Sequence, residues 1–155
     1  MRNRGREFAR RERQRQITAE VAAETNTLKV KRLLAEAPPL FNKQVESFKA
    51  WLEGYNEVQP DDPQKRMSFS TLSPDSFRIT KGLNNERIEL IVCFHPNNAY
   101  FTCVSNPRGY GAVFCYDLDS DGKVTLYSGG KAMDCDTASD AVLRAFISRL
   151  WQSGD

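Results

Sequence analysis

The chain has 155 residues, of which 40% are hydrophobic and 27% charged. It is long enough for one domain with its own core, and its composition excludes collagen-like, rod-like and wholly disordered classes. The net charge of +2 is unevenly placed. Residues 1–36 hold ten Lys or Arg and five Asp or Glu, a balance of +5, whereas residues 37–155 hold twelve and fifteen, a balance of −3. We therefore predict a basic N-terminal arm (1–36) on a slightly acidic domain (37–155).

No apolar run approaches the ~20 residues that a membrane-spanning helix needs, and the N-terminus lacks the apolar core of a secretory signal. Glu7 and Glu12 interrupt the Arg-rich start, which transit peptides avoid. The four cysteines form no C-x-x-C pair, and three of them lie in apolar segments, as free thiols in a reducing compartment do. We expect a cytoplasmic protein without a membrane partner.

The first 57 residues predict two helices. Residues 6–25 are good helix formers with a thin apolar face, and residues 28–34 fit a short helix or a strand. Pro38 and Pro39 are expected to end that segment. A second helix follows, because Phe41, Phe48 and Leu52 fall with Val45 on one stripe, and Gly54 is expected to stop it.

From residue 67 the apolar period changes to two, which indicates strands. The clearest are "SFRIT", "RIELIVCF", "AYFTCVS", "YGAVFCYDL" and "KVTLYS", with "MSFSTL" as a further candidate. Short turn sequences separate them, so neighbouring strands must be antiparallel. The segment "DTASDAVLRAFISRLW" predicts a C-terminal helix packed on the sheet. The fold class is therefore α+β, with an antiparallel meander of about five strands.

The segment "DLDSDGKV" places Asp117, Asp119 and Asp121 before Gly122, like the start of a calcium loop. A helical calcium loop needs Glu at its twelfth position, where this chain has Ser128 between two predicted strands. A three-residue hairpin loop, 120–122, explains more. It places Leu118 opposite Val124, Tyr116 opposite Leu126 and Asp119 opposite Lys123. We interpret the triplet as a turn and predict no metal.

The predicted sheet is apolar on both faces. One face carries Ile88, Leu90, Val92 and Phe94; the other carries Ile91, Cys93, Tyr100, Thr102, Val104, Val113, Cys115 and Tyr127. The second face is too apolar to be fully solvated. We expect the chain's own helices to cover it; the alternative is a surface for a ligand, a partner or a second copy.

Cys93 and His95 share that second face, since they are two residues apart on one strand. A Cys–His nucleophile pair, or a zinc site with Cys103 or Cys115, is conceivable. No paired motif supports either chemistry, so a half-exposed strand-end histidine and a core cysteine are the stronger interpretation. No loop matches a phosphate-binding or dinucleotide-binding fingerprint. We predict no cofactor and no catalytic residue, and favour a protein that is not an enzyme.

The arm contains seven arginines in fifteen residues, namely Arg2, Arg4, Arg6, Arg10, Arg11, Arg13 and Arg15. Arginine suits bidentate contact with phosphate or carboxylate groups. The leading hypothesis is a non-enzymatic protein-interaction module, such as an adaptor, an inhibitor or immunity-type protein, or a subunit of a larger assembly. Its contacts would be the seven arginines with Tyr100, Tyr110 and Tyr127, to a protein partner or a second copy. The alternatives are a nucleic-acid-associated protein that uses the arm, and a small-molecule enzyme or ligand binder on the second sheet face.

Overall fold

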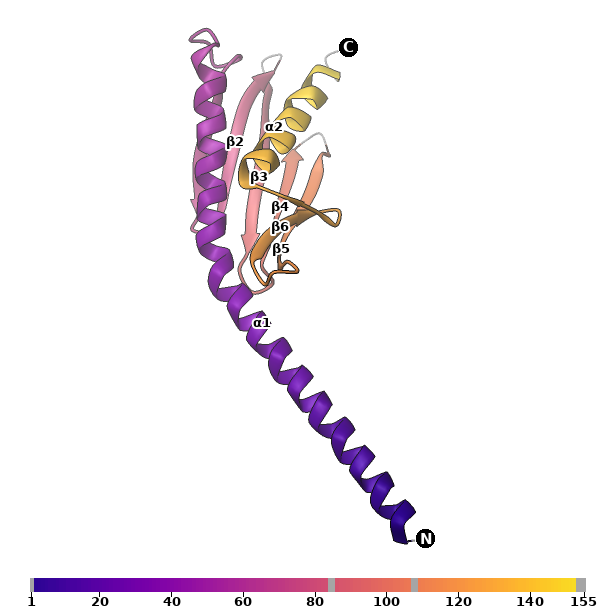
Figure 1. Ribbon diagram of the computed structural model, residues 1–155. Coiled ribbons are helices and arrows are strands. Elements are labelled where there is room, and N and C mark those ends of the chain that lie inside the picture. Colours follow the sequence, from indigo (N-terminus) through magenta and orange to yellow (C-terminus); the bar gives the residue numbers. More distant parts are fainter. Residues whose placement is uncertain (1, 84–85, 107–108, 153–155) are drawn as a thin grey trace.

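A computed structural model describes residues 2–83, 86–106 and 109–152. A long helix, α1 (Arg2–Glu57), precedes the strands and a shorter helix, α2 (Cys135–Gln152), follows them (Figure 1). The strands are β1 (Met67–Ser73), β2 (Ser76–Leu83), β3 (Glu86–His95), β4 (Tyr100–Asn106), β5 (Gly111–Leu118), β6 (Val124–Ser128) and β7 (Lys131–Met133). They form one antiparallel sheet in the order β1-β2-β3-β4-β5-β6-β7. The predicted α+β meander is confirmed, with seven strands in the described residues instead of about five.

The two additional strands lie at the ends of the sheet. β1 contains the segment "MSFSTL", which the sequence predicts as a further candidate strand. β7 has only three residues and follows Gly129 and Gly130, which both adopt positive φ angles in a tight turn. A three-residue strand is too short to show a period of two, and only its pairing with β6 defines it.

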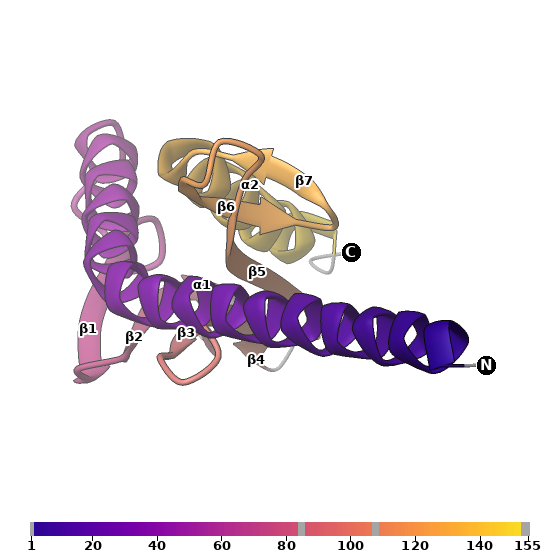
Figure 2. The ribbon, with the colours of Figure 1, turned by 60° about the horizontal axis from the view of Figure 1, so that its bottom comes forward.

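The N-terminal region is one helix of 56 residues, so the predicted break into two helices is wrong. Pro38 and Pro39 lie inside it. A proline lacks the backbone N–H that would bond the carbonyl one turn earlier, and this weakens and bends a helix. Figures 1 and 2 show α1 bending near the point where it meets the rest of the molecule. Long as it is, α1 is polar, and no helix of the described residues is apolar enough to cross a membrane.

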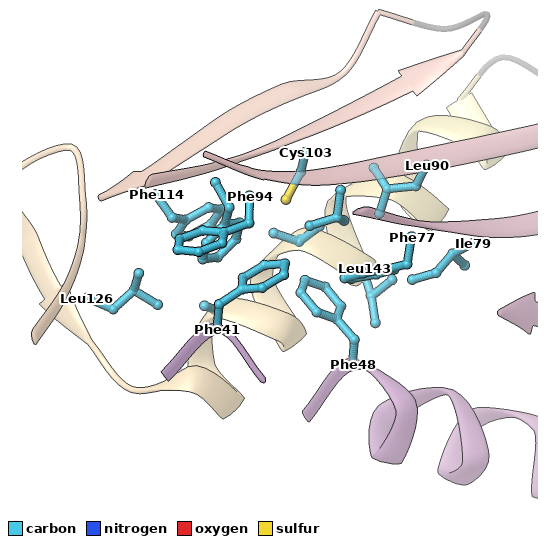
Figure 3. Packing of buried hydrophobic residues seen from close by; sticks show 14 of the residues in the cluster. Phe41, Phe48, Phe77, Ile79, Leu90, Phe94, Cys103, Phe114, Leu126 and Leu143 are labelled. Carbon is cyan, nitrogen blue, oxygen red and sulfur yellow. The ribbon is translucent and has the colours of Figure 1, made fainter. Parts of the chain in front are cut away.

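The second half of α1 continues through the prolines because it contributes to the core. Ala37, Phe41, Phe48 and Leu52 are at most 4% exposed, and their side chains face the sheet. The Phe41 ring stacks on Phe94 with centroids 4.6 Å apart, whereas Phe48 meets Phe77 edge-on at 5.3 Å. Figure 3 shows both rings pointing from α1 towards the sheet, beside Leu143 of α2. Burial of these side chains outweighs the loss of backbone hydrogen bonds at the prolines.

Polar groups join α1 to α2 across the core. The Gln44 Nε2 atom donates to the Cys135 carbonyl at 2.9 Å and to Ser139 Oγ at 2.7 Å. Ser47 Oγ lies 2.8 Å from Ser139 Oγ and donates to Asp136 Oδ1 at 2.7 Å. Because hydrogen bonds are directional, these contacts set the position of α2 along α1 more closely than apolar packing alone would.

Candidate functional site

The face of the sheet turned away from both helices is the candidate site, and we call it the open face. Burial alternates along β3, where Ile88, Leu90, Val92 and Phe94 are buried and the residues between them are not. α1 and α2 contact each other and lie over the same side of the sheet (Figure 1). The expectation that the chain's own helices would cover the second face is therefore wrong.

Strand register places the side chains of the open face in rows across the sheet. One row joins Arg78, Ile91 and Val104, and the next joins Cys93, Thr102 and Val113. The third row joins His95, Tyr100, Cys115, Tyr127 and Ala132. The residues that the sequence assigned to the second face of the sheet therefore lie on one surface. Its centre is apolar, and the Arg78–Glu89 ion pair, 3.5 Å long, borders it.

Two valines at the centre of the open face are unusually exposed. Val104 is 51% exposed and Val113 is 53% exposed. They lie on neighbouring strands, where Val104 pairs with Gly111 and Val113 pairs with Thr102. Single exposed apolar residues are ordinary, but a contiguous exposed patch in the middle of a sheet is typical of an interaction surface.

The three tyrosines chosen from sequence do not act together. Tyr100 and Tyr127 lie on the open face, both half-buried, and the Tyr100 ring stacks on His95 with centroids 4.4 Å apart. Tyr110 is half-buried too, and it packs against the core. Alternation along "YGAVFCYDL" puts Tyr110 in step with Phe114 and Tyr116, which are buried on the helix side, so the choice of Tyr110 as an exposed contact went against that pattern.

The basic arm is the first part of α1 and projects away from the sheet (Figure 1). All seven arginines chosen from sequence are exposed. Among the described residues, none of the seven lies within 4 Å of a carboxylate. Their charges are therefore available to a partner.

The arm also carries an apolar stripe. Ile17, Val21 and Leu28 are 43%, 56% and 66% exposed. Their spacings of four and seven place them within about 40° of one another around the helix. A thin apolar face was predicted here. The structure adds that these three side chains are exposed and take no part in the core.

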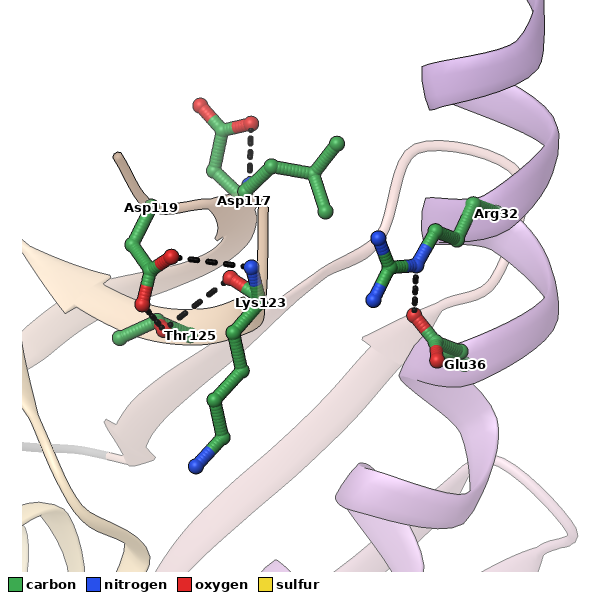
Figure 4. Close-up of polar contacts among 7 residues, drawn as sticks. Arg32, Glu36, Asp117, Asp119, Lys123 and Thr125 are labelled. Carbon is green, nitrogen blue, oxygen red and sulfur yellow. Dashed lines mark hydrogen bonds and ion pairs between the residues drawn. The ribbon is translucent and has the colours of Figure 1, made fainter. Parts of the chain in front are cut away.

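The aspartate triplet forms a turn, as predicted (Figure 4). Leu118 pairs with Val124 and Gly122 has a φ of 76°. The Asp119 Oδ1 atom accepts hydrogen bonds from the amides of Asp121 and Lys123, both at 2.9 Å. Its Oδ2 atom accepts one from Thr125 Oγ1 at 3.1 Å.

These contacts occupy both carboxylate oxygens of Asp119. The backbone hydrogen bond from Lys123, followed by that from Asp121, holds the pKa of Asp119 below its ordinary value. In the described part of the chain, no group of three His, Cys, Asp or Glu residues is arranged to hold a metal ion. The turn chemistry alone therefore accounts for Asp119.

The cysteines occupy different environments. Cys103 is buried on the helix side, and burial raises the pKa of its thiol far above the ordinary range. Cys115 is exposed and Cys93 is half-buried, both on the open face. Cys93 and His95 share that face as predicted, but the imidazole stacks on Tyr100. Nothing in this geometry activates the Cys93 thiol as a nucleophile.

Comparison with known proteins gives no relationship. No family model matches the chain, and neither a curated protein nor a solved structure is significantly similar to it. The functional argument therefore depends on the molecule's own surfaces.

Proposed function

We propose that this protein is a non-enzymatic interaction module that self-associates, with the basic arm of one copy lying on the open face of a second copy. The observation that carries the proposal is the open face itself. Both helices cover one side of the sheet, and the other side presents Val104 and Val113 to solvent.

A second copy of the chain offers a surface that fits this face. Its arm has an apolar stripe of Ile17, Val21 and Leu28 that its own core cannot reach. From Arg2 to Val30 the arm is about 42 Å long at ~1.5 Å per residue. The sheet is about 29 Å wide, from six strand spacings of ~4.8 Å. One arm is thus long enough to cross the whole sheet.

Charge favours the same pairing. The first 36 residues carry a balance of +5 and the remainder −3. Two arms placed together would bring seven arginines of each copy into one region, which is unfavourable. An arm placed on the acidic domain of another copy instead brings opposite charges together.

Reciprocal exchange would close the assembly as a dimer with twofold symmetry. A helix ~10 Å wide that crosses a sheet about 29 Å wide covers about 290 Å² on each partner. With both partners counted, two reciprocal contacts then bury about 1,200 Å² in total, the lower end of the range for specific interfaces. Contacts that do not close reciprocally would give rings or filaments.

Sedimentation velocity over a range of protein concentrations tests the proposal. The wild type is expected to be oligomeric, and the V104S/V113S and I17S/V21S variants to be monomeric. The matched controls are Phe8→Ser and Leu72→Ser. Phe8 is 65% exposed and lies off the arm stripe. Leu72 is 48% exposed and lies on the edge strand β1. A wild type that stays monomeric, or controls that dissociate as readily as the test variants, would overturn the proposal.

Nucleic-acid binding is a second candidate, and a different observation favours it. The seven arginines of the arm are exposed and lack nearby carboxylates in the described residues. Such a helix can neutralise phosphates, and its affinity for nucleic acid would fall steeply with salt.

Fluorescence anisotropy with labelled RNA and DNA tests nucleic-acid binding. Replacing Arg10, Arg11, Arg13 and Arg15 with Gln should weaken binding and flatten its salt dependence, whereas V104S/V113S should change neither. Binding that ignores salt would rule this function out.

A further inference from the structure

A cavity of about 460 Å³ lies on the helix side of the sheet, away from the open face. α1, the strands β5, β6 and β7, and the beginning of α2 surround it. Its volume is within the range of small-molecule sites, which are mainly apolar with a few polar groups. Leu40, Val124, Leu126 and Met133 provide the apolar wall.

Three charged residues border this cavity. Lys43 projects from α1, Lys123 precedes β6 and Asp134 precedes α2, and all three are exposed. The Asp134 Oδ1 atom accepts a hydrogen bond from the Thr137 amide at 2.7 Å. Neither lysine has a carboxylate within 4 Å among the residues that the structure describes. Figure 4 shows the Lys123 ammonium group extending away from the Asp119 carboxylate. An anionic group at the cavity mouth could therefore meet two available ammonium groups.

Two buried polar atoms of the lining residues have no hydrogen-bond partner in the described structure. They are Gln44 Oε1, a hydrogen-bond acceptor, and the Tyr116 hydroxyl. The other end of the Gln44 amide is already bonded to Cys135 and Ser139. Burial raises the pKa of Tyr116, so its hydroxyl remains a neutral donor. Buried polar groups are nearly always paired, and two orphans at one cavity point to a missing partner.

We propose that this cavity binds an aliphatic hydroxycarboxylic acid of medium chain length. Its carboxylate meets Lys43 and Lys123, and its chain lies along the apolar wall. Its hydroxyl group, which is both donor and acceptor, satisfies Gln44 and Tyr116. Both orphan atoms are buried beneath the cavity surface, so neighbouring side chains must move to admit the ligand. Met133 lines the cavity, and its unbranched thioether side chain allows such movement.

The first test compares 3-hydroxyoctanoate with octanoate by calorimetry and by mapping of amide NMR shifts. We expect 3-hydroxyoctanoate to bind about fivefold more tightly, the gain typical of one or two net hydrogen bonds. Shifts should centre on residues 124–126 and 133–135. Equal affinities, no binding at millimolar concentration, or shifts centred on Val104 and Val113 would overturn the proposal.

Variants then test each contact. Lys43→Met with Lys123→Met should weaken both ligands about tenfold, through loss of charge-assisted contacts. The matched pair Lys31→Met and Lys65→Met removes the same charge elsewhere and should leave affinity unchanged. Tyr116→Phe should reduce the preference for the hydroxylated acid without weakening octanoate, because the contact with Gln44 remains. An undiminished preference in Tyr116→Phe would refute the role of its hydroxyl group. These cavity variants should have the same sedimentation coefficient as the wild type, whether or not the protein self-associates.

Discussion

Replacement of Phe48 by Ala should separate the part of α1 that belongs to the core from the part that does not. Phe48 is fully buried and its ring contacts Phe77. Loss of such a ring destabilises a protein by about 3–5 kcal/mol, from lost transfer energy and the cavity left behind. With ~2.1 cal/mol/K of unfolding entropy per residue, a folded unit of about 120 residues loses roughly 12–20 °C in Tm.

Urea unfolding followed by far-ultraviolet circular dichroism measures this difference. The matched control is Val21→Ala in the arm, where the side chain is 56% exposed. Its effect should stay within about 0.5 kcal/mol, as for surface positions generally. The unfolding is measured at a protein concentration at which the wild type and the I17S/V21S variant have the same sedimentation coefficient. Association then makes no contribution to the measured stability. If Phe48→Ala costs less than about 1 kcal/mol, or Val21→Ala costs as much as Phe48→Ala, the assignment of α1 to core and arm is wrong.

Three further predictions concern the hairpin and the thiols. Asp119→Ala should destabilise the protein at neutral pH. The pKa of Asp119 is lower in the folded than in the unfolded protein, so the ionised carboxylate stabilises the fold. The difference in unfolding free energy between wild type and variant should therefore persist above the unfolded pKa and vanish as the pH falls through the folded pKa. A free-energy difference that stays constant with pH in urea titrations would contradict this. Gly122→Ala should cost about 1–2 kcal/mol because of the positive φ, whereas Gly122→Asn is tolerated better, as thermal unfolding would show. A thiol-labelling time course should modify exposed Cys115 first and leave buried Cys103 unmodified until the protein unfolds; early labelling of Cys103 would contradict its burial.

The β5–β6 hairpin was predictable because its information is local. Apolar residues at 116, 118, 124 and 126 permit one register, and a glycine at 122 provides the left-handed turn position. The same alternation assigned Ile91, Val104 and Val113 to one face of the sheet. Short turns made every neighbouring pair antiparallel, so the meander followed without knowledge of distant contacts.

The break at Pro38 and Pro39 was predicted wrongly because local preference opposed tertiary packing. Two prolines weaken an isolated helix, but Ala37 and Phe41 on either side of them are buried against the rest of the molecule. The free energy of that burial acts only in the folded chain, so no local pattern reveals it.

The sequence by itself determined the α+β class, the order of the five clearest strands, the side of the sheet that most of their side chains occupy and the basic character of the arm. These properties depend on side-chain period, turn chemistry and charge, which are read along the chain. The tertiary structure alone decided that both helices cover the same face, that the arm stripe stays exposed, and that Lys43, Lys123, Gln44 and Tyr116 line one cavity. Such arrangements depend on contacts between residues about 70 or more positions apart, and neither periodicity nor composition specifies which distant surfaces meet.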